Sequence, residues 1–278
     1  RLGDVSEMIG GNAVVKRPAD PDLMYQIYDL SAYLAPILAA ISTNVYQAGW
    51  RLVPTVDPSK PDARRRVESA LAFEATGLDF DAEHDVDEAD VDKELARLKR
   101  RIPREQQYFK AFIAQCCPDM SYDRLVAITG LDMEITGDGY WEVLRDAGGR
   151  PARFIWTPSR HIRVVMFDDG SGSYGQSVLP PDTLVTCRQR TPLSDIHWGW
   201  TIQQRRFRQF VQVVNGKILA RFKEYGDPRV LSRTSGKYYS SLDELLAQDS
   251  EWPSKKVNQG DPPQPATELL VFSVPYSG

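Results

Sequence analysis

The sequence has few of the residues that usually carry metal binding or catalysis. It holds three cysteines and three histidines in 278 residues. Their spacing matches none of the zinc-binding patterns HxH, HExxH or CxxC. A P-loop and the GxSxG motif are also absent, and the glycines of GDGYW and DAGGR do not form GxGxxG at a strand-to-helix junction. We therefore expect no metal, no cofactor and no enzymatic activity.

The cysteines and the charge narrow the class of protein further. Cys116 and Cys117 are adjacent and Cys187 stands alone, which is a poor framework for disulfides. The pattern favours free thiols in a reducing compartment. The formal net charge of -4 argues against a general nucleic-acid coat, whose affinity depends on excess Lys and Arg. A local basic site remains open.

Long apolar runs are also missing. The most apolar window, YLAPILAAISTNVYQAGW, is broken by Pro36 and several polar residues. It falls short of the roughly 20 apolar residues that a membrane span needs. Its apolar positions have helical spacing and predict a core-facing helix; they are Leu34, Ile37, Leu38, Ile41 and Val45. The first residues lack a signal-peptide stretch and an initiator Met, so we expect residues to precede Arg1.

The order of periodic segments predicts an α+β fold, with N-terminal helices packed on a mostly antiparallel, meandering sheet. Helical patterns cover about 34–47, 58–75, 103–117 and 121–137, and short strands follow from Tyr140 onward. WRLVPTV, at 50–56, also reads as a strand. We expect an irregular arm over 1–30 and one domain over 31–278. That domain would contain an acidic and basic insertion at about 57–102, whose acidic part at 79–94 we expect to be a solvated loop.

A basic hairpin is the most distinctive element of the second half. Asn215-Gly216 joins two β-rich runs, which predicts a tight turn with positive φ at both residues. Arginines crowd this stretch, among them Arg205, Arg206, Arg208 and Arg221. They could contact phosphate, lie solvated on a two-faced strand pair, or contact a neighbouring subunit. The last reading has support from an acidic block at 79–94 and a basic block at 97–104, since complementary blocks favour one register between subunits.

Four carboxylates offer an alternative function. Asp132, Glu134, Asp138 and Glu142 lie within eleven residues. Such a cluster could serve a metal-dependent nuclease or a glycoside hydrolase. No His or Lys accompanies them at a spacing typical of a catalytic site. The pattern favours the exposed side of a helix end for Asp132 and Glu134, a turn for Asp138 and the solvent-facing side of a strand for Glu142.

Four segments in the same order resemble bacteriophage portal proteins. They are SAYLAPILAAISTNVYQAGWRLVP at 31–54, the block from DRLVAITG to HIRVV at 123–165, FKEYGDPR at 222–229, and ELLVFSVPYSG at 268–278. The segment at 57–102 matches nothing in that family. The resemblance implies a portal wing-like domain; the stem, clip and crown of portal proteins are not in this chain.

The resemblance also implies a function, together with partners. Portal proteins form a dodecameric ring at one capsid vertex of the virion, assembled in the host cytoplasm, through which double-stranded DNA is packaged and ejected. Such a ring meets the major capsid protein, the terminase motor and the head-tail connector or adaptor, and it involves no membrane. Lys223, Gly226, Asp227, Pro228 and Arg229 match the family's signature, with a structural role. We expect Arg229 to be partly buried and hydrogen-bonded, and neighbouring subunits to contact head to tail.

Overall fold

In this computed structural model the described residues are 6–9, 12–16, 19–46, 49–76, 86–168, 176–177, 184–192, 198–249 and 264–273. Helices combine with antiparallel and parallel strand pairs, so the chain has the α+β fold that the sequence predicts. The chain divides into two compact units. The first comprises 1–49, 116–187 and 204–278, and the second 50–115 and 188–203.

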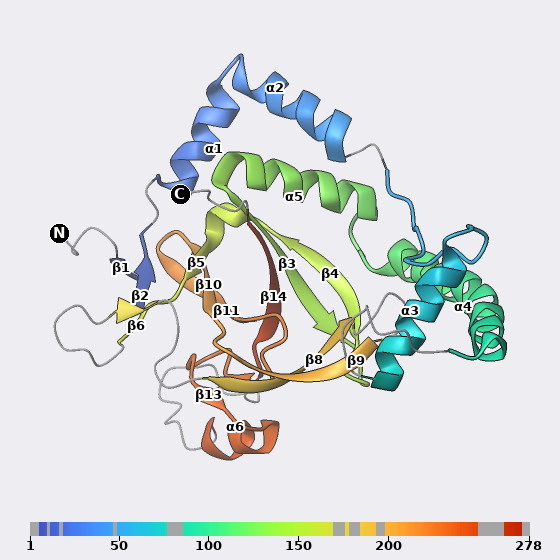
Figure 1. Ribbon diagram of the computed structural model, residues 1–278. Coiled ribbons are helices and arrows are strands. Elements are labelled where there is room, and N and C mark those ends of the chain that lie inside the picture. The colour runs from blue at the N-terminus through green and yellow to red at the C-terminus, as the bar shows by residue number, and fades with distance from the viewer. Residues whose placement is uncertain are drawn as a thin grey trace. The chain divides into compact units, whose positions relative to one another are not determined.

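A six-stranded sheet forms the body of the first unit (Figure 1). Its strand order is β4-β3-β14-β11-β10-β5. The pairs are antiparallel except for β11 with β14, which is parallel. The bounds are β3 (Asp138–Arg145), β4 (Pro151–Thr157), β5 (Ile162–Val164), β10 (Gln209–Val214), β11 (Lys217–Glu224) and β14 (Thr267–Ser273). Strand β14, the last in the chain, thus lies between β3 and the hairpin of β10 and β11.

The predicted hairpin is confirmed in β10 and β11. Val214 pairs with Lys217, leaving Asn215 and Gly216 as a two-residue turn. Their φ angles are 51° and 71°, so both take the left-handed conformation that a turn of this kind requires. Asn tolerates this region better than other side chains, and Gly adopts it without steric cost.

Helix α5 (Tyr122–Thr136) packs against β3 of this sheet, where Trp141 Nε1 donates to Thr129, and a separate cluster of buried side chains consists of strand residues alone. Five buried side chains from five strands form one cluster: Tyr140, Ile162, Phe210, Phe222 and Leu269. Helix α5 begins and ends where the sequence predicts. The Ser121 side chain accepts a hydrogen bond from the Arg124 N–H, and Gly137 ends the helix with φ 83°. These caps satisfy end groups that would otherwise lack partners.

The expectation of an irregular arm over 1–30 is wrong for the residues that the structure describes. They contain strands β1 (Ser6–Ile9) and β2 (Asn12–Val15), paired with each other, and helix α1 (Pro21–Leu30). The Asp20 side chain caps α1 by accepting from the Asp22 N–H, and Pro21 occupies the first turn. Asp before Pro is a start signal for a helix.

The next helix is less buried than its apolar spacing predicts. It consists of α2 (Leu34–Ile41) and a π-helical turn, η2 (Ser42–Tyr46), and it contacts α1 and α5. Leu38 is buried, but Ile37 and Val45 are 57% and 60% exposed. The helix was expected to turn its apolar side chains toward the core, and it does so on one side only, because α5 covers it from one direction (Figure 1).

The second unit is built on a pair of helices, α3 (Ala63–Thr76) and α4 (Glu88–Gln115). Both contribute to a core that also includes Val56. In α4 the inward residues Val91, Leu95, Leu98 and Ile102 follow a helical repeat. The strand expected at 50–56 is wrong: no strand is assigned there, and Pro54 has no N–H to offer a ladder.

Two further expectations about this region are wrong. The helix expected from Pro103 begins fifteen residues earlier at Glu88, and Pro103 lies inside it. The acidic block was expected to be a loop; its described part is the start of α4, and 79–85 fall outside the described residues. Glu88 and Asp90 suit this position because carboxylates interact favourably with the positive end of a helix.

Shorter elements complete the chain. They are η3 (Ser159–His161), β6 (Phe167–Asp168), β7 (Gln176–Ser177), β8 (Val185–Pro192), β9 (Trp198–Arg205), β12 (Val230–Leu231), β13 (Tyr238–Tyr239) and α6 (Leu242–Asp249). Strands β6 and β7, β8 and β9, and β12 and β13 form two-stranded sheets. Within the described residues, every helix is too short or too polar to cross a bilayer.

Candidate functional site

The GDPR turn, Gly226 to Arg229, follows directly on β11 and is the first candidate site. Gly226 has φ 88°, and a Cβ added there would meet nothing within 4 Å. The glycine is needed for its backbone angle and not for space. The Asp227 N–H donates to the Glu224 carbonyl at 3.1 Å, which reverses the chain.

Asp227 and Arg229 form a two-pronged ion pair inside this turn. The Arg229 Nε donates to Asp227 Oδ1 at 3.0 Å, and Nη2 donates to Oδ2 at 2.8 Å. The Arg229 backbone N–H adds a third bond to Oδ1 at 3.0 Å. The Asp227 side chain is 0% exposed and that of Arg229 is 14% exposed. The expectation that Arg229 is partly buried and hydrogen-bonded is confirmed.

An aromatic ring supports the guanidinium. The Arg229 Cζ atom lies 3.9 Å from the centroid of the Tyr238 ring, which comes from β13. A cation over a ring face is attracted by the quadrupole of the ring. Burial raises the pKa of the Tyr238 phenol, and the nearby Asp227 carboxylate raises it further. The ring therefore stays neutral beneath the cation.

Lys223 connects the turn to the sheet. Its Nζ atom donates to the carbonyls of Asp227 at 2.7 Å and Arg229 at 2.8 Å. The same atom lies 3.4 Å from Glu268 Oε1 on β14. Glu268 also accepts from Arg145 on β3, with Nη2 to Oε2 at 2.6 Å. This hydrogen bond raises the pKa of Arg145 against the effect of its burial.

This chain of contacts gives the GDPR turn a structural role in the described chain. It joins the turn to three neighbouring strands, β11, β14 and β3, through charged groups that are mostly buried. Tyr238, Glu268 and Arg145 were not predicted as site residues from the sequence. Glu268 has a detectable signal, since a carboxylate in an otherwise apolar strand, ELLVF, calls for a cationic partner.

The four arginines expected at a subunit interface fall into two groups. Arg208 bonds Glu224 within the chain, with Nη2 to Oε1 at 2.9 Å, and Arg221 is half-buried beside Gly236. Arg205 and Arg206 are exposed, and Arg205 lies over the Phe207 ring. An interface role stays a prediction for all four, but of these arginines only Arg205 and Arg206 are exposed.

The four carboxylates proposed for the alternative function differ in how deeply they are buried. Asp132 is 2% exposed and accepts hydrogen bonds from Tyr25, from Trp156 Nε1 at 3.0 Å and from the Ser159 N–H at 3.1 Å. The expectation of an exposed Asp132 is therefore wrong, because α1 and η3 pack over this side of α5. Burial raises the pKa of Asp132, and the three hydrogen bonds oppose the rise.

The other three carboxylates have different surroundings. Glu134 is exposed and accepts from Tyr46 at 3.1 Å, Asp138 begins β3, and Glu142 accepts from Thr267 at 2.6 Å. In the part of the chain that the structure describes, no group of three or more His, Cys, Asp or Glu side chains could hold a metal ion. The tertiary structure thus does not bring the four together as one metal centre.

The adjacent thiols face each other after the end of α4. Cys116 Sγ and Cys117 Sγ are 3.4 Å apart, and neither is in a disulfide. Burial, followed by the contact with Cys116, raises the pKa of Cys117 to about 12. Cys187 is buried and is in no disulfide either. His161 is half-buried with a lowered pKa because of its burial, and His84 and His197 lie outside the described residues.

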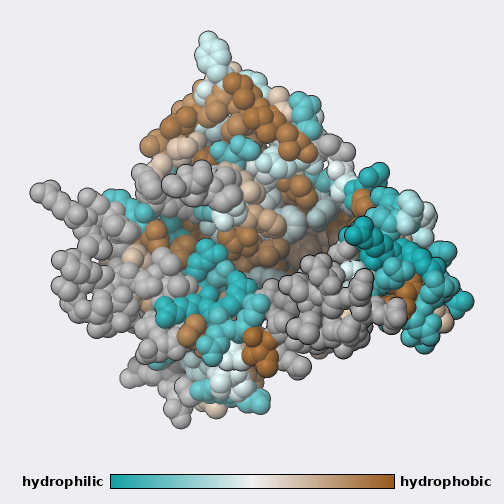
Figure 2. Space-filling model, in the orientation of Figure 1, coloured by the Kyte–Doolittle hydropathy of each residue, from teal (hydrophilic) through white to brown (hydrophobic). Residues whose placement is uncertain are grey.

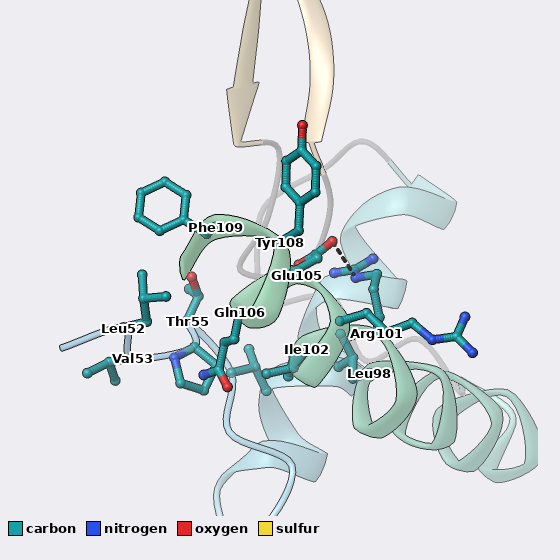
Figure 3. A pocket seen from close by; sticks show the side chains of 13 residues that line it. Leu52, Val53, Thr55, Leu98, Arg101, Ile102, Glu105, Gln106, Tyr108 and Phe109 are labelled. Carbon is teal, nitrogen blue, oxygen red and sulfur yellow. Dashed lines mark ion pairs between the residues drawn. The ribbon is translucent and has the colours of Figure 1, made fainter. Parts of the chain in front are cut away.

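A cavity of about 630 Å³ opens in the second unit (Figure 3). One side comes from 52–56, with Leu52 and Val53, and the other from α4, with Leu98 and Ile102. Tyr108 and Phe109 are 70% and 42% exposed at this cavity. The volume is typical of ligand pockets, and the lining is largely apolar. We call it the α4 pocket.

Charged side chains border the α4 pocket. Arg101 and Arg104 come from α4, and the Arg101 Nε lies 3.3 Å from Glu105 Oε1 (Figure 3). That nitrogen is buried and makes no hydrogen bond of good geometry. Arg104 is exposed. The pocket therefore combines an apolar floor with cationic groups at its border.

No protein-family model matches this chain. Among curated proteins of Bacillus subtilis strain 168, it is 33% identical over 177 residues to the phage-like element PBSX protein XkdE, covering 63% of this chain and 32% of that protein. It is 28% identical over 162 residues to the uncharacterized protein YqbA, covering 58% and 28%. The match spans about a third of each relative's length. The chain is thus homologous to a protein of a phage-like element, which supports a phage-associated protein.

Proposed function

We propose that the chain is part of a bacteriophage portal protein. In this proposal many copies form a ring at one capsid vertex, and double-stranded DNA passes through the ring during packaging and ejection. The terminase motor and the head-tail connector dock on the ring, and the major capsid protein surrounds it. The ring itself catalyses no reaction and binds no cofactor.

One observation carries the proposal. Three of the four segments that resemble portal proteins are far apart in the sequence, yet they fold into one unit. The segment at 123–165 supplies α5, β3, β4 and β5, that at 222–229 supplies the end of β11 with the GDPR turn, and that at 268–278 supplies most of β14. Chance matches to short motifs would have no reason to become neighbours in one sheet.

The ion-pair network strengthens this argument. Lys223, Asp227 and Arg229, which match the family's signature, contact one another and Glu268. A signature whose members bond one another is explained by a structural role. The phage-element relative, matched over 177 residues, supports the same setting.

The assembled mass tests the proposal. The protein, expressed as its gene encodes it, should form a closed ring of about a dozen copies, seen by native mass spectrometry and electron microscopy. The channel should admit B-form DNA. A protein that stays monomeric or dimeric at micromolar concentration, with and without capsid protein, would contradict the proposal.

The same preparation can test the alternative enzyme. It would be incubated with DNA and with oligosaccharides in the presence of Mg²⁺ or Mn²⁺, beside the variants Glu134→Gln and Asp138→Asn. We expect no turnover above buffer. Metal-dependent hydrolysis that either substitution abolishes would favour the nuclease or glycoside hydrolase reading over the portal.

A further inference from the structure

The chain leaves an apolar surface uncovered where α1 meets α2. This surface, the helix corner, consists of residues 29–33. Leu30 is 85% exposed and Tyr33 is 83% exposed, and Ile27 and Ile37 extend the apolar area along the two helices. Figure 2 shows hydrophobic residues concentrated over α1 and α2 on the face in view. Scattered exposed apolar residues are normal, but a contiguous patch marks an interaction site.

The α4 pocket is the second such surface. Val53 is 62% exposed and Tyr108 is 70% exposed at this pocket. The apolar spacing of the helices predicted at 34–47 and 103–117 is that of a buried face, and these helices contain Ile37 beside the helix corner and Tyr108 and Phe109 at the pocket. Side chains patterned for burial and left in water imply a partner that covers them.

Charge complementarity indicates what that partner is. The helix corner begins with Asp29, an exposed carboxylate that has no ion pair among the described residues. The α4 pocket is bordered by Arg104, also exposed and without an ion pair in the described part, and by Arg101, whose buried Nε lies 3.3 Å from Glu105 Oε1 without a hydrogen bond of good geometry. An occupant with two large apolar side chains beside a carboxylate fits the pocket, and the helix corner has that composition.

We infer that the helix corner of one copy docks in the α4 pocket of a second copy. Leu30 and Tyr33 fill the apolar floor, and Asp29 faces Arg101 and Arg104. The inference rests on the proposed ring and names the surfaces that build it. Because the two surfaces differ, the contact is heterologous: each copy uses its corner on one neighbour and its pocket on the other, as a ring above two copies requires.

Charge reversal tests the pairing. In the protein as its gene encodes it, Asp29→Arg and Arg104→Glu each place like charges in contact, and each should weaken self-association at least about ten-fold. The chain that carries both substitutions again pairs opposite charges at positions 29 and 104 of every contact, while Arg101 is unchanged, and should recover at least part of the assembly. Arg153→Glu, at an exposed arginine of β4 outside both surfaces, is the matched control and should leave assembly unchanged.

A mixing experiment tests the heterologous geometry. A variant with a blocked corner, Leu30→Asp with Tyr33→Asp, and a variant with a blocked pocket, Val53→Asp, should each fail to form rings. An equimolar mixture keeps one intact corner and one intact pocket, so it should form 1:1 heterodimers that do not grow. Leu219→Asp, at a leucine that is 59% exposed on β11, controls for the loss of an exposed apolar side chain.

The outcomes separate this inference from the proposed function. Rings that form normally in the corner and pocket variants would overturn the inference and leave the ring in place, with other surfaces or another occupant of the pocket responsible. A wild-type protein that never assembles would overturn the proposed function and the inference with it. Rings lost in both single charge variants but not recovered in the double variant would also overturn the pairing of Asp29 with Arg104.

Discussion

Removing the charge of Asp227 should destabilise the first unit strongly. Asp227→Asn keeps the size of the side chain but replaces one acceptor oxygen with an amide that can only donate. The Arg229 guanidinium, 14% exposed, would then face a donor and lose its counter-ion. The backbone N–H of Arg229 would keep one acceptor at most.

The size of the effect follows from burial. Removing one partner of a buried ion pair costs about 3–5 kcal/mol. Because Arg229 keeps some contact with water and with the Tyr238 ring, we expect the lower end, about 3 kcal/mol. For a unit of this size, that corresponds to a fall in Tm of about 6–12 °C. Arg229→Lys keeps the charge and loses the fork, and should cost about 1–1.5 kcal/mol.

Urea unfolding, followed by tryptophan fluorescence, measures both variants. Arg64→Lys is the control, because Arg64 pairs with Glu68 at 3.4 Å on the surface of α3, where both side chains are more than 40% exposed. Exposed pairs contribute about 0–1 kcal/mol. If Asp227→Asn and Arg229→Lys cost no more than Arg64→Lys, the network argument is wrong and the GDPR segment is only a solvated turn.

Two further changes test single features of the first unit. Gly226→Ala places a Cβ at φ 88° and should cost about 1–2 kcal/mol in the same urea assay, whereas Gly148→Ala, at a glycine without positive φ, should cost less; equal effects would remove the conformational argument. Asp132 has a folded-state pKa raised by burial, so its ionised form destabilises the fold as the pH rises above the ordinary carboxyl value of about 4. The wild-type chain should therefore lose stability relative to Asp132→Asn between about pH 4 and neutrality, and parallel pH profiles would contradict this.

Features that depend on neighbouring residues were predictable from the sequence. The turn at Asn215-Gly216, the Ser121 cap of α5 and its end at Gly137 all appear where the sequence places them. Each is decided by a side chain or a φ angle within about four residues of the feature. Where the prediction failed locally, a signal was passed over, as with Asp20 and Pro21 at the start of α1.

Pro103 shows where local signals compete. Proline favours a first turn, but the apolar repeat of Val91, Leu98 and Ile102, which packs against α3, runs up to the proline, and Ile113 after it is also buried. Packing along a whole helix outweighs the loss of one backbone hydrogen bond, so the helix runs through the proline. The sequence contains both signals, but only the packing of α4 decides between them.

Burial and ion pairing were decided by the tertiary structure alone. Asp132 has the local pattern of an exposed helix end, and it is buried because Tyr25 and Ser159, 107 and 27 residues away, cover it. Glu268 meets Arg145 across 123 residues because β14 inserts between β3 and β11. Local backbone geometry depends on the nearest neighbours along the chain, so it can be predicted from the sequence. Desolvation and charge pairing depend on which distant segments pack beside a side chain, and only the tertiary structure shows that.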